Sequence, residues 1–297
     1  MQLDQYKAKQ MREGGGFVAA LDQSGGSTPK ALRLYGVAEE QYSSEDEMFD
    51  LIHGMRERIV RSPAFTGEKV IGAILFEQTM DRDFAGAPAP EYLWKTRGVV
   101  PFLKIDKGLE EAKDGVKLMK PMPHLSKVLP HARELGVFGT KERSVIDAAN
   151  QAGITANVEQ QFAVGHEVLG HGLVPILEPE ITISIDDKPE AEAMLRDAIL
   201  SGLDGVPDDQ QVMLKLTLPE VGGFYQALID HPRVMRVVAL SGGYSRQEAN
   251  RRLTENPGMI ASFSRALTEG LSAQQSQDGF DATLSDTIDS IYRASIT

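Results

Sequence analysis

The chain has 297 residues, of which 41% are hydrophobic and 25% are charged, and it contains no Cys. This content suits one large α/β domain or two smaller ones, and the lack of Cys excludes a disulfide framework and a thiolate metal site. The net charge of −12 predicts an acidic surface that repels nucleic acids and anionic lipids. The sequence shows no apolar signal core and no apolar run near the roughly 18 residues that span a membrane. We therefore expect a cytoplasmic protein without nucleic-acid or membrane partners.

Eight short apolar runs alternate with amphipathic stretches, which is the pattern of repeated strand–helix units. The predicted strands are residues 17–21, 70–76, 100–105, 136–140, 173–177, 212–216, 234–240 and 259–263. The predicted helices are residues 44–60, 144–152, 156–170, 189–201, 219–230, 245–253, 265–272 and 281–294. Helix N-caps are expected at Ser44, Asn157 and Ser245, each followed by Glu in the first turn. The alternation predicts a (β/α)₈ TIM barrel that forms a single domain over residues 1–297, with an open doubly wound sheet as the alternative.

Polar residues stand at or near the carboxyl end of every predicted strand. In a barrel these ends share one face, where active sites are built. Members of a pair two residues apart point to the same side of a strand. Glu77 also follows a strand, but a surface carboxylate is the better interpretation there. The remaining strand-end residues are Asp22, Lys104 with Asp106, Lys141 with Arg143, Glu178 with Glu180, Lys215, Ser241 and Arg265.

Lys215 lies inside the apolar run VMLKLTLP rather than after it. A buried ammonium group costs several kcal/mol unless it is paired or neutral. Neighbouring cations such as Lys104 and Lys141 favour the neutral amine, which can attack a ketone, and Glu178 could remove water from the resulting carbinolamine. The alternative is that Lys215 reaches solvent or forms a structural ion pair. The convergence of polar strand ends favours catalysis.

Two Gly-rich loops follow predicted strands and are candidate phosphate sites. The segment LSGGYS at residues 240–245 places Ser241 and two Gly after the seventh strand, where backbone N–H groups can surround an anion. Arg265 follows the eighth strand and would add a charge-assisted hydrogen bond. The loop DQSGGS at residues 22–27, which contains Ser24 and Ser27, could hold a second phosphate. Barrels often use the loops after strands seven and eight for phosphate.

The segment HEVLGH at residues 166–171 looks like a zinc motif but has the wrong spacing. His166 and His171 are five residues apart, which places them about 140° apart around a helix. No GxGxxG motif and no P-loop occurs in the chain. We therefore predict neither a metal site nor a nucleotide cofactor.

The motifs together resemble those of class I fructose-bisphosphate aldolase in its shorter bacterial form. The resemblance runs from AALDQSGGS to FSRAL and is most specific in LKIDKG (103–108), PILEPEI (175–181), MLKLTLP around Lys215, and LSGG (240–243). It implies a TIM barrel that needs no metal and no cofactor. It also implies a lyase of glycolysis and gluconeogenesis that cleaves fructose 1,6-bisphosphate reversibly to dihydroxyacetone phosphate and glyceraldehyde 3-phosphate.

The resemblance also implies a role for each matching residue. Lys215 corresponds to the lysine that forms the Schiff base, Glu178 to the main proton-transferring carboxylate and Glu180 to a neighbour that supports dehydration. Asp22 corresponds to the residue that orients the C4 hydroxyl, and Lys141 stabilises charge near it. The substrate-binding residues implied are Lys104, Arg143 beside Lys141, Ser241, Gly242 and Arg265 for the C1 phosphate, and Ser24 and Ser27 near the C6 phosphate.

The sequence departs from the animal forms of the family at three places. Gln23 stands where they have Glu, Ala31 stands where an Arg helps to bind the C6 phosphate, and the chain ends at Thr297 rather than at a catalytic Tyr. Tyr292 is therefore given no role. The rival interpretations are a transaldolase or another sugar-phosphate aldolase, a sugar-phosphate sensor without turnover, and a structural scaffold. The sequence leaves open whether the chain is a monomer or a homo-oligomer.

Overall fold

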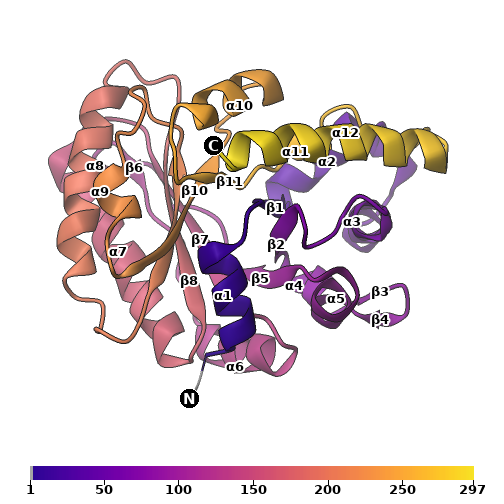
Figure 1. Ribbon diagram of the computed structural model, residues 1–297, viewed down its shortest axis with the longest axis horizontal. Helices are drawn as coiled ribbons and strands as arrows, with labels where there is room; N and C mark the ends of the chain where they lie inside the picture. Colours follow the sequence, from indigo (N-terminus) through magenta and orange to yellow (C-terminus); the bar gives the residue numbers. More distant parts are fainter. Residues whose placement is uncertain (1–2) are drawn as a thin grey trace.

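The computed structural model describes residues 3–297 and shows a barrel of parallel strands surrounded by helices (Figure 1). Each strand of the barrel pairs in parallel with the next one along the path. The barrel closes where the backbone N–H of Ala20 donates to the carbonyl of Phe263, 3.1 Å away. This confirms the predicted (β/α)₈ barrel. The strands are, in order, β1 (Phe17–Leu21), β2 (Val70–Leu75), β5 (Val100–Lys104), β7 (Gly139–Ile146), β8 (Val174–Ile181), β9 (Val212–Thr217), β10 (Val234–Leu240) and β11 (Ile260–Ala261).

The connections between these strands contain the helices and two small hairpins. Between β1 and β2 lie η1 (Gly25–Ser27), α2 (Thr28–Leu34), η2 (Glu39–Gln41) and α3 (Glu45–Arg61). Between β2 and β5 lie α4 (Glu77–Met80), β3 (Asp83–Phe84), β4 (Ala87–Pro88), α5 (Ala89–Glu91) and the π-helix η3 (Tyr92–Thr96). The remaining elements are α1 (Gln5–Glu13), β6 (Val116–Lys117), α6 (Leu125–Glu134), α7 (Gln151–Gly170), α8 (Lys188–Leu203), α9 (Gln226–Ile229), α10 (Arg246–Thr254), α11 (Arg265–Thr268) and α12 (Gln277–Ser295).

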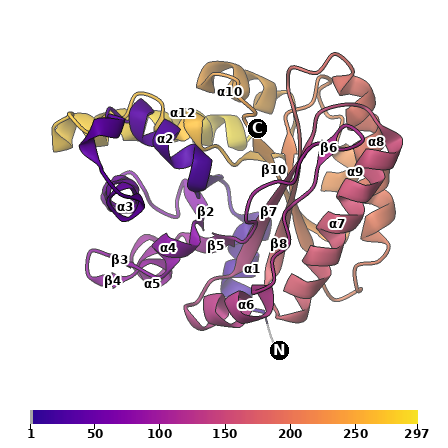
Figure 2. The same cartoon turned by 180° about the vertical axis from the view of Figure 1, so that it is seen from behind.

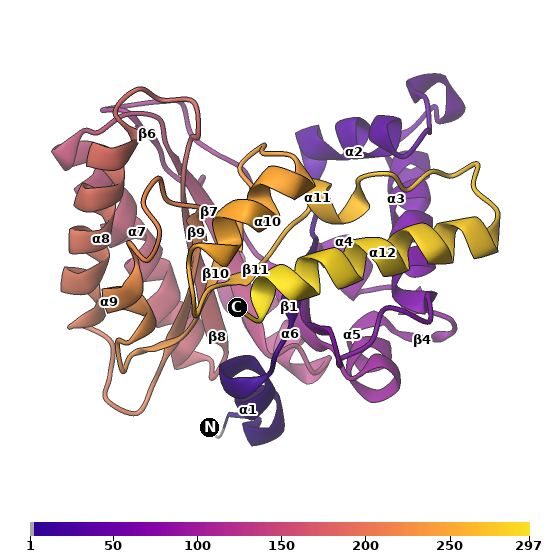
Figure 3. The same cartoon turned by 45° about the horizontal axis from the view of Figure 1, so that its top comes forward.

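The helices cover the outside of the barrel on two flanks. Figure 1 and Figure 2 show α7, α8 and α9 on one flank and α2, α3, α4 and α5 on the other. Helix α12 lies lengthwise outside β1 and β11, as Figure 3 shows, and its Ser295 Oγ accepts a hydrogen bond from the N–H of Ala261 at 3.0 Å. No helix within residues 3–297 is long and apolar enough to cross a membrane.

Two apolar cores follow from the alternation of side chains along the strands. Outward residues such as Ala19 and Leu214 pack under the helices, because successive side chains on a strand point to opposite faces. Inward residues such as Phe102, Ile176 and Met213 fill the barrel, and Met11 of α1 covers its amino-terminal end. The inward positions nearer the carboxyl ends are polar instead. The barrel interior is therefore apolar at one end and charged at the other.

The predicted helix at residues 144–152 is wrong, and the fourth strand is longer than predicted. β7 runs from Gly139 to Ile146, and its last residues pair with β6 in antiparallel fashion. Its side chains alternate, with Lys141 and Arg143 lining a cavity inside the barrel while Glu142 and Ser144 are buried on the opposite face. The strand was predicted to end at residue 140 because its later residues are polar, yet both of its faces bury charged or hydroxyl groups.

Two of the three predicted N-caps are confirmed. Ser44 Oγ accepts a hydrogen bond from the N–H of Glu47, and Ser245 Oγ accepts one from the N–H of Glu248. Asn157 is not a cap, because α7 begins earlier and Asn150 accepts the hydrogen bond from Gly153 N at 3.0 Å. The predicted helix at residues 219–230 is reduced to α9, since the segment after β9 turns instead. Helices α1, α2 and α6 were not predicted.

Candidate active site

A cavity of about 550 Å³ opens at the carboxyl ends of the barrel strands. All twelve residues predicted for the site line this cavity, although they come from loops and strands far apart in the chain. Most of the ionisable members come from the strands, and the hydroxyl and glycine members lie in two of the loops. The twelve residues are Asp22, Ser24, Ser27, Lys104, Lys141, Arg143, Glu178, Glu180, Lys215, Ser241, Gly242 and Arg265.

Lys215 occupies the inward position of β9 that follows the core residue Met213. Its side chain is only 5% exposed, and its Nζ lies 2.9 Å from Oε1 of Glu178 on the neighbouring strand β8. A buried ammonium group needs such a partner, because an isolated charge in an apolar interior is costly. The amine is therefore dry and is held within hydrogen-bonding distance of one carboxylate.

Lys141 of β7 lies among three buried carboxylates. Its Nζ is 2.7 Å from Asp22 Oδ2, 3.0 Å from Glu178 Oε2 and 3.8 Å from Asp106 Oδ2. Glu178 thus contacts Lys215 with one oxygen and Lys141 with the other. The two lysines and Glu178 form a continuous chain of charges across the base of the cavity.

The charges in this cluster shift each other's pKa. Burial by itself would raise the pKa of Asp22 and of Glu178, but the positive charges of Lys141 and Lys215 outweigh burial and lower both. Burial by itself would lower the pKa of Lys141, but Asp22, Glu178 and Asp106 outweigh it and raise the pKa. The pKa of Lys104 is lowered by burial and by Lys141, against the attraction of Asp106. Near neutral pH the cluster therefore holds ionised carboxylates and a charged Lys141.

Asp106 is a member of the cluster that was recognised as a strand-end residue but was given no role in the predicted site. It is buried at the end of β5, where its Oδ1 accepts a hydrogen bond from Lys104 Nζ at 2.7 Å and its Oδ2 accepts one from Arg143 N at 3.2 Å. The signal was available in the motif LKIDKG, because Lys104 and Asp106 are two residues apart at a strand end. Asp106 connects Lys104 to the Lys141 group.

Arg143 and Glu180 form a second ion pair above the first cluster. Each follows a site residue by two positions, on β7 and β8 respectively, so both point into the barrel. Arg143 Nε donates to Glu180 Oε2. This pair is more exposed than the Lys141 group, and it lies nearer the cavity mouth.

The loop after β10 contains two glycines in the left-handed region of backbone conformation. Gly242 and Gly243 have φ angles of +59° and +117°, which a side chain would strain. A Cβ atom on Gly242 would also lie only 2.6 Å from Ile183 Cγ2. Arg265, at the start of α11, places its guanidinium close to Gly243, 3.4 Å from the position that a Cβ atom would occupy. Ser241, Gly242 and Arg265 are thus brought together at one end of the cavity.

The loop after β1 lies at another part of the cavity and is joined to the end of β11. Ser27 Oγ donates to Ser24 O at 2.9 Å, which closes the turn. Gln23 Nε2 donates to Ser264 Oγ at 2.9 Å, and the buried Arg56 donates to Gln23 O. Lys30 and Ala31 of α2 also line this part of the cavity. Gln23, Lys30 and Ser264 were given no role, because a single polar residue in a turn, or in a helix that was not predicted, gives no specific signal.

Other residues considered in the sequence lie away from the cavity. Glu77 begins α4 and pairs with Lys107. Tyr292 lies on α12 and packs against the outer core. His166 of α7 contacts Phe162 in a groove between α7 and α8. Within residues 3–297, no group of three or more His, Asp or Glu side chains has the arrangement of a metal site.

Comparisons with known proteins agree with this geometry. A sequence-family model described as fructose-bisphosphate aldolase class-I matches residues 3–221. The proteins named fructose-bisphosphate aldolase class 1 from Synechocystis sp. and Porphyromonas gingivalis are each 54% identical over 294 residues. These matches cover 99% of this chain and 98% and 100% of the two relatives. The structure of a fructose-bisphosphate aldolase from Plasmodium falciparum superimposes with a TM-score of 0.78 at 20% identity, covering 99% of this chain and 96% of that one.

Proposed function

The chain belongs to the class I fructose-bisphosphate aldolase family, and we propose that Lys215 is the amine on which it cleaves fructose 1,6-bisphosphate. Enzymes of this class perform the reversible aldol cleavage through a Schiff base and need no metal. The observation that supports Lys215 most directly is its contact with Glu178, because a buried amine beside a carboxylate can release its proton over 2.9 Å.

The proposed reaction begins when the amine of Lys215 attacks C2 of the open-chain sugar. Glu178 takes the proton that Lys215 releases and returns it to the carbinolamine hydroxyl, so that water leaves, while the ion pair of Glu180 and Arg143 lies above the reacting carbon. The resulting iminium accepts electrons from the breaking C3–C4 bond. Glu178 takes the proton from the C4 hydroxyl, which Asp22 orients, and glyceraldehyde 3-phosphate leaves. The enamine is then protonated, and hydrolysis releases dihydroxyacetone phosphate and restores Lys215.

The cationic and Gly-rich parts of the cavity are proposed to hold the two phosphates. Ser241, Gly242 and Arg265 would bind the C1 phosphate, while Ser24 and Ser27 would lie near the C6 phosphate. Lys104 and Lys141 supply positive charge between these ends, where the carbonyl and the C4 hydroxyl react. A protein with a net charge of −12 gathers these cations inside one cavity, which supports an anionic substrate.

We further propose that residues 1–297 form a single domain that acts in the cytoplasm on a sugar bisphosphate, without a nucleic-acid or membrane partner. The acidic composition and the lack of Cys support this location. Light scattering after size-exclusion chromatography decides between a monomer and a homo-oligomer.

Trapping of the Schiff base tests the proposal. We expect borohydride in the presence of dihydroxyacetone phosphate to attach the ligand covalently to Lys215, as measured by peptide mass spectrometry. The variant Lys215→Met should form no adduct while keeping its thermal unfolding transition. An adduct on another lysine, or none in the wild type, contradicts the role of Lys215. Activity on a panel of sugar phosphates separates this enzyme from transaldolases and related aldolases, and turnover separates it from a sensor.

A further inference from the structure

Lys188 is a buried cation outside the proposed reaction. It lies at the start of α8, its side chain is 3% exposed, and its Nζ has three acceptors. These are a carboxylate oxygen of Glu192, the carbonyl of Leu218 at 2.9 Å and Oε1 of Glu220 at 2.9 Å. An ammonium group has three hydrogens, so these contacts use all of its donors. Lys188 therefore ties α8 to the segment that follows β9, only three residues after Lys215.

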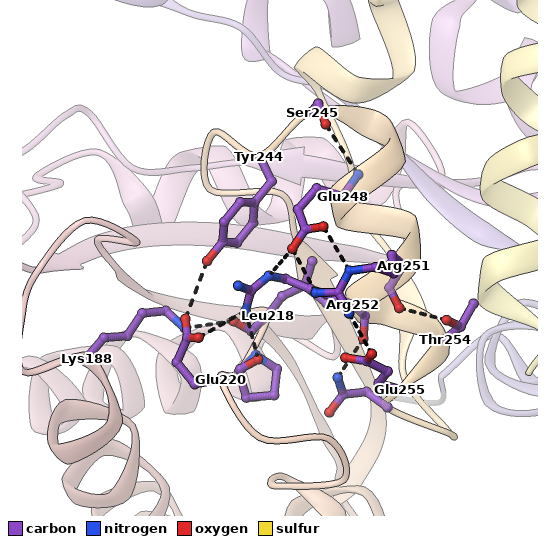
Figure 4. A network of polar contacts seen from close by, with 12 residues as sticks. Lys188, Leu218, Glu220, Tyr244, Ser245, Glu248, Arg251, Arg252, Thr254 and Glu255 are labelled. Carbon is purple, nitrogen blue, oxygen red and sulfur yellow. Dashed lines mark hydrogen bonds and ion pairs between the residues drawn. The ribbon is translucent and has the colours of Figure 1, made fainter.

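Glu220 extends this contact from the segment after β9 to the loop after β10, as Figure 4 shows. Its backbone N–H donates to Glu192 Oε2 at 3.2 Å, so its position is fixed from α8. Its Oε1 accepts from Lys188 and from the hydroxyl of Tyr244, the latter at 3.5 Å. Its Oε2 lies 3.3 Å from Arg252 Nη1 on α10. One carboxylate thus contacts three separate elements.

Tyr244 directly follows the two glycines of the loop that contains Ser241 and Gly242. Its backbone N–H donates to Ser241 O at 2.9 Å, which closes the turn. Arg252 lies over the Tyr244 ring, with its Cζ 4.5 Å from the ring centre, and Glu248 fixes Arg252 at 2.8 Å. Arg252 therefore holds the ring of Tyr244 and Glu220 holds its hydroxyl. Arg252 and Glu220 also contact each other.

We infer that Glu220, held by Lys188, is a positioning residue that fixes the Ser241–Gly242 loop relative to Lys215 and thereby sets the affinity for the phosphate bound there. Lys188 and Leu218 place Glu220 relative to β9, which contains Lys215. Glu220 and Arg252 place Tyr244, and Tyr244 places Ser241. Gly242 and Gly243 leave the loop backbone flexible, so the position of the loop depends on contacts with residues outside it. This inference rests on the proposed function, since it assigns the C1 phosphate to this loop.

The test uses Glu220→Gln, which keeps the size of the side chain and removes the charge that Lys188 and Arg252 contact. Lys188 keeps Glu192 and Leu218 as partners, so the fold should persist, whereas removing Lys188 would leave Glu192 buried without its partner. The concentration of dihydroxyacetone phosphate that gives half-maximal borohydride trapping on Lys215 is measured. We expect it to rise roughly fivefold, or about 1 kcal/mol. KM for fructose 1,6-bisphosphate should rise similarly while kcat changes less than about twofold.

Two further variants make the result specific. Glu255→Gln is the matched control. Glu255 follows the last residue of α10 and pairs with Arg251 on the exposed side of that helix, away from Glu220. Tyr244→Phe removes only the hydroxyl, and combining it with Glu220→Gln should give less than the sum of the two effects, since both act through one contact. An unchanged half-saturating concentration in Glu220→Gln, an equal shift in Glu255→Gln, or a loss confined to kcat overturns the inference. Failure of the wild type to form the imine would instead reject the proposed function.

Discussion

Glu178 stands between two buried lysines, with Oε1 2.9 Å from Lys215 Nζ and Oε2 3.0 Å from Lys141 Nζ. The two lysines come from strands on either side of β8, so Glu178 is the carboxylate that both reach. Lys141 helps to keep Glu178 ionised in the resting site, so Glu178 is available to accept a proton from Lys215.

Replacing Glu178 with Gln should slow the reaction without preventing substrate binding. The amide cannot exchange protons with the carbinolamine or the C4 hydroxyl, and general acid–base groups typically contribute about 10² to 10⁴ in rate. We expect kcat to fall by roughly that factor, with KM changing far less. Steady-state kinetics on fructose 1,6-bisphosphate measures this. A variant within about tenfold of the wild-type kcat would show that another group transfers the proton.

Replacing Asp22 with Asn should separate cleavage from imine formation. Asp22 contacts Lys141 and is proposed to hold the C4 hydroxyl, which dihydroxyacetone phosphate does not have. Cleavage of fructose 1,6-bisphosphate should therefore fall by roughly 10²-fold or more. Borohydride trapping with dihydroxyacetone phosphate should continue at a rate near that of the wild type. Parallel loss of both reactions would mean that Asp22 acts on the amine instead.

Replacing Glu142 with Gln should increase stability more at neutral pH than in acid. Glu142 is fully buried behind Lys141 and accepts a hydrogen bond from Thr140 Oγ1 at 3.1 Å. Burial raises its pKa well above the usual range, Asp106 and Glu178 add to the increase, and Thr140 and Lys141 oppose it. Because the folded state holds a proton that the unfolded state releases above about pH 4.3, wild-type stability falls as the pH rises through this range.

Thermal unfolding at several pH values measures this difference. Gln cannot ionise, so the variant should gain melting temperature relative to the wild type between about pH 5 and pH 7. Glu134→Gln, at the exposed end of α6, is the matched surface control. A constant difference between variant and wild type across this range would mean that Glu142 is ionised in the folded protein.

The barrel and most of the site could be predicted from the sequence because both depend on simple periodicities. Apolar strands separated by helices predict the sheet, and the polar residue that ends each strand marks the carboxyl face. Lys215 was recognisable because a charged side chain is unexpected within an apolar strand such as VMLKLTLP. The family motifs added the assignment of phosphate loops, which Gly-Gly turns alone do not specify.

The errors came from residues whose burial depends on tertiary contacts. Glu142 and Ser144 belong to a strand because Gln161 and Asn157 of α7 meet them in a buried polar layer, which local propensity does not reveal. Asn157 was predicted to be an N-cap because its type is common there. In the structure its side chain instead bonds Ser144 on the neighbouring strand. Asp106 and Gln23 gain their positions partly from Arg143 and Arg56, which are distant from them in sequence.

The single backbone hydrogen bond between Ala20 and Phe263 makes the β1–β11 junction the weakest seam of the barrel. Asp22 and Arg265 stand on opposite sides of this seam, so the two halves of a bound sugar would straddle it. Helix α12 holds the two strands together from outside the barrel, because Ser295 is hydrogen-bonded to β11 while the helix packs on β1. Loosening α12 should therefore widen the gap between Asp22 and Arg265, the residues proposed to hold the C4 hydroxyl and the C1 phosphate, although α12 need not contact either residue.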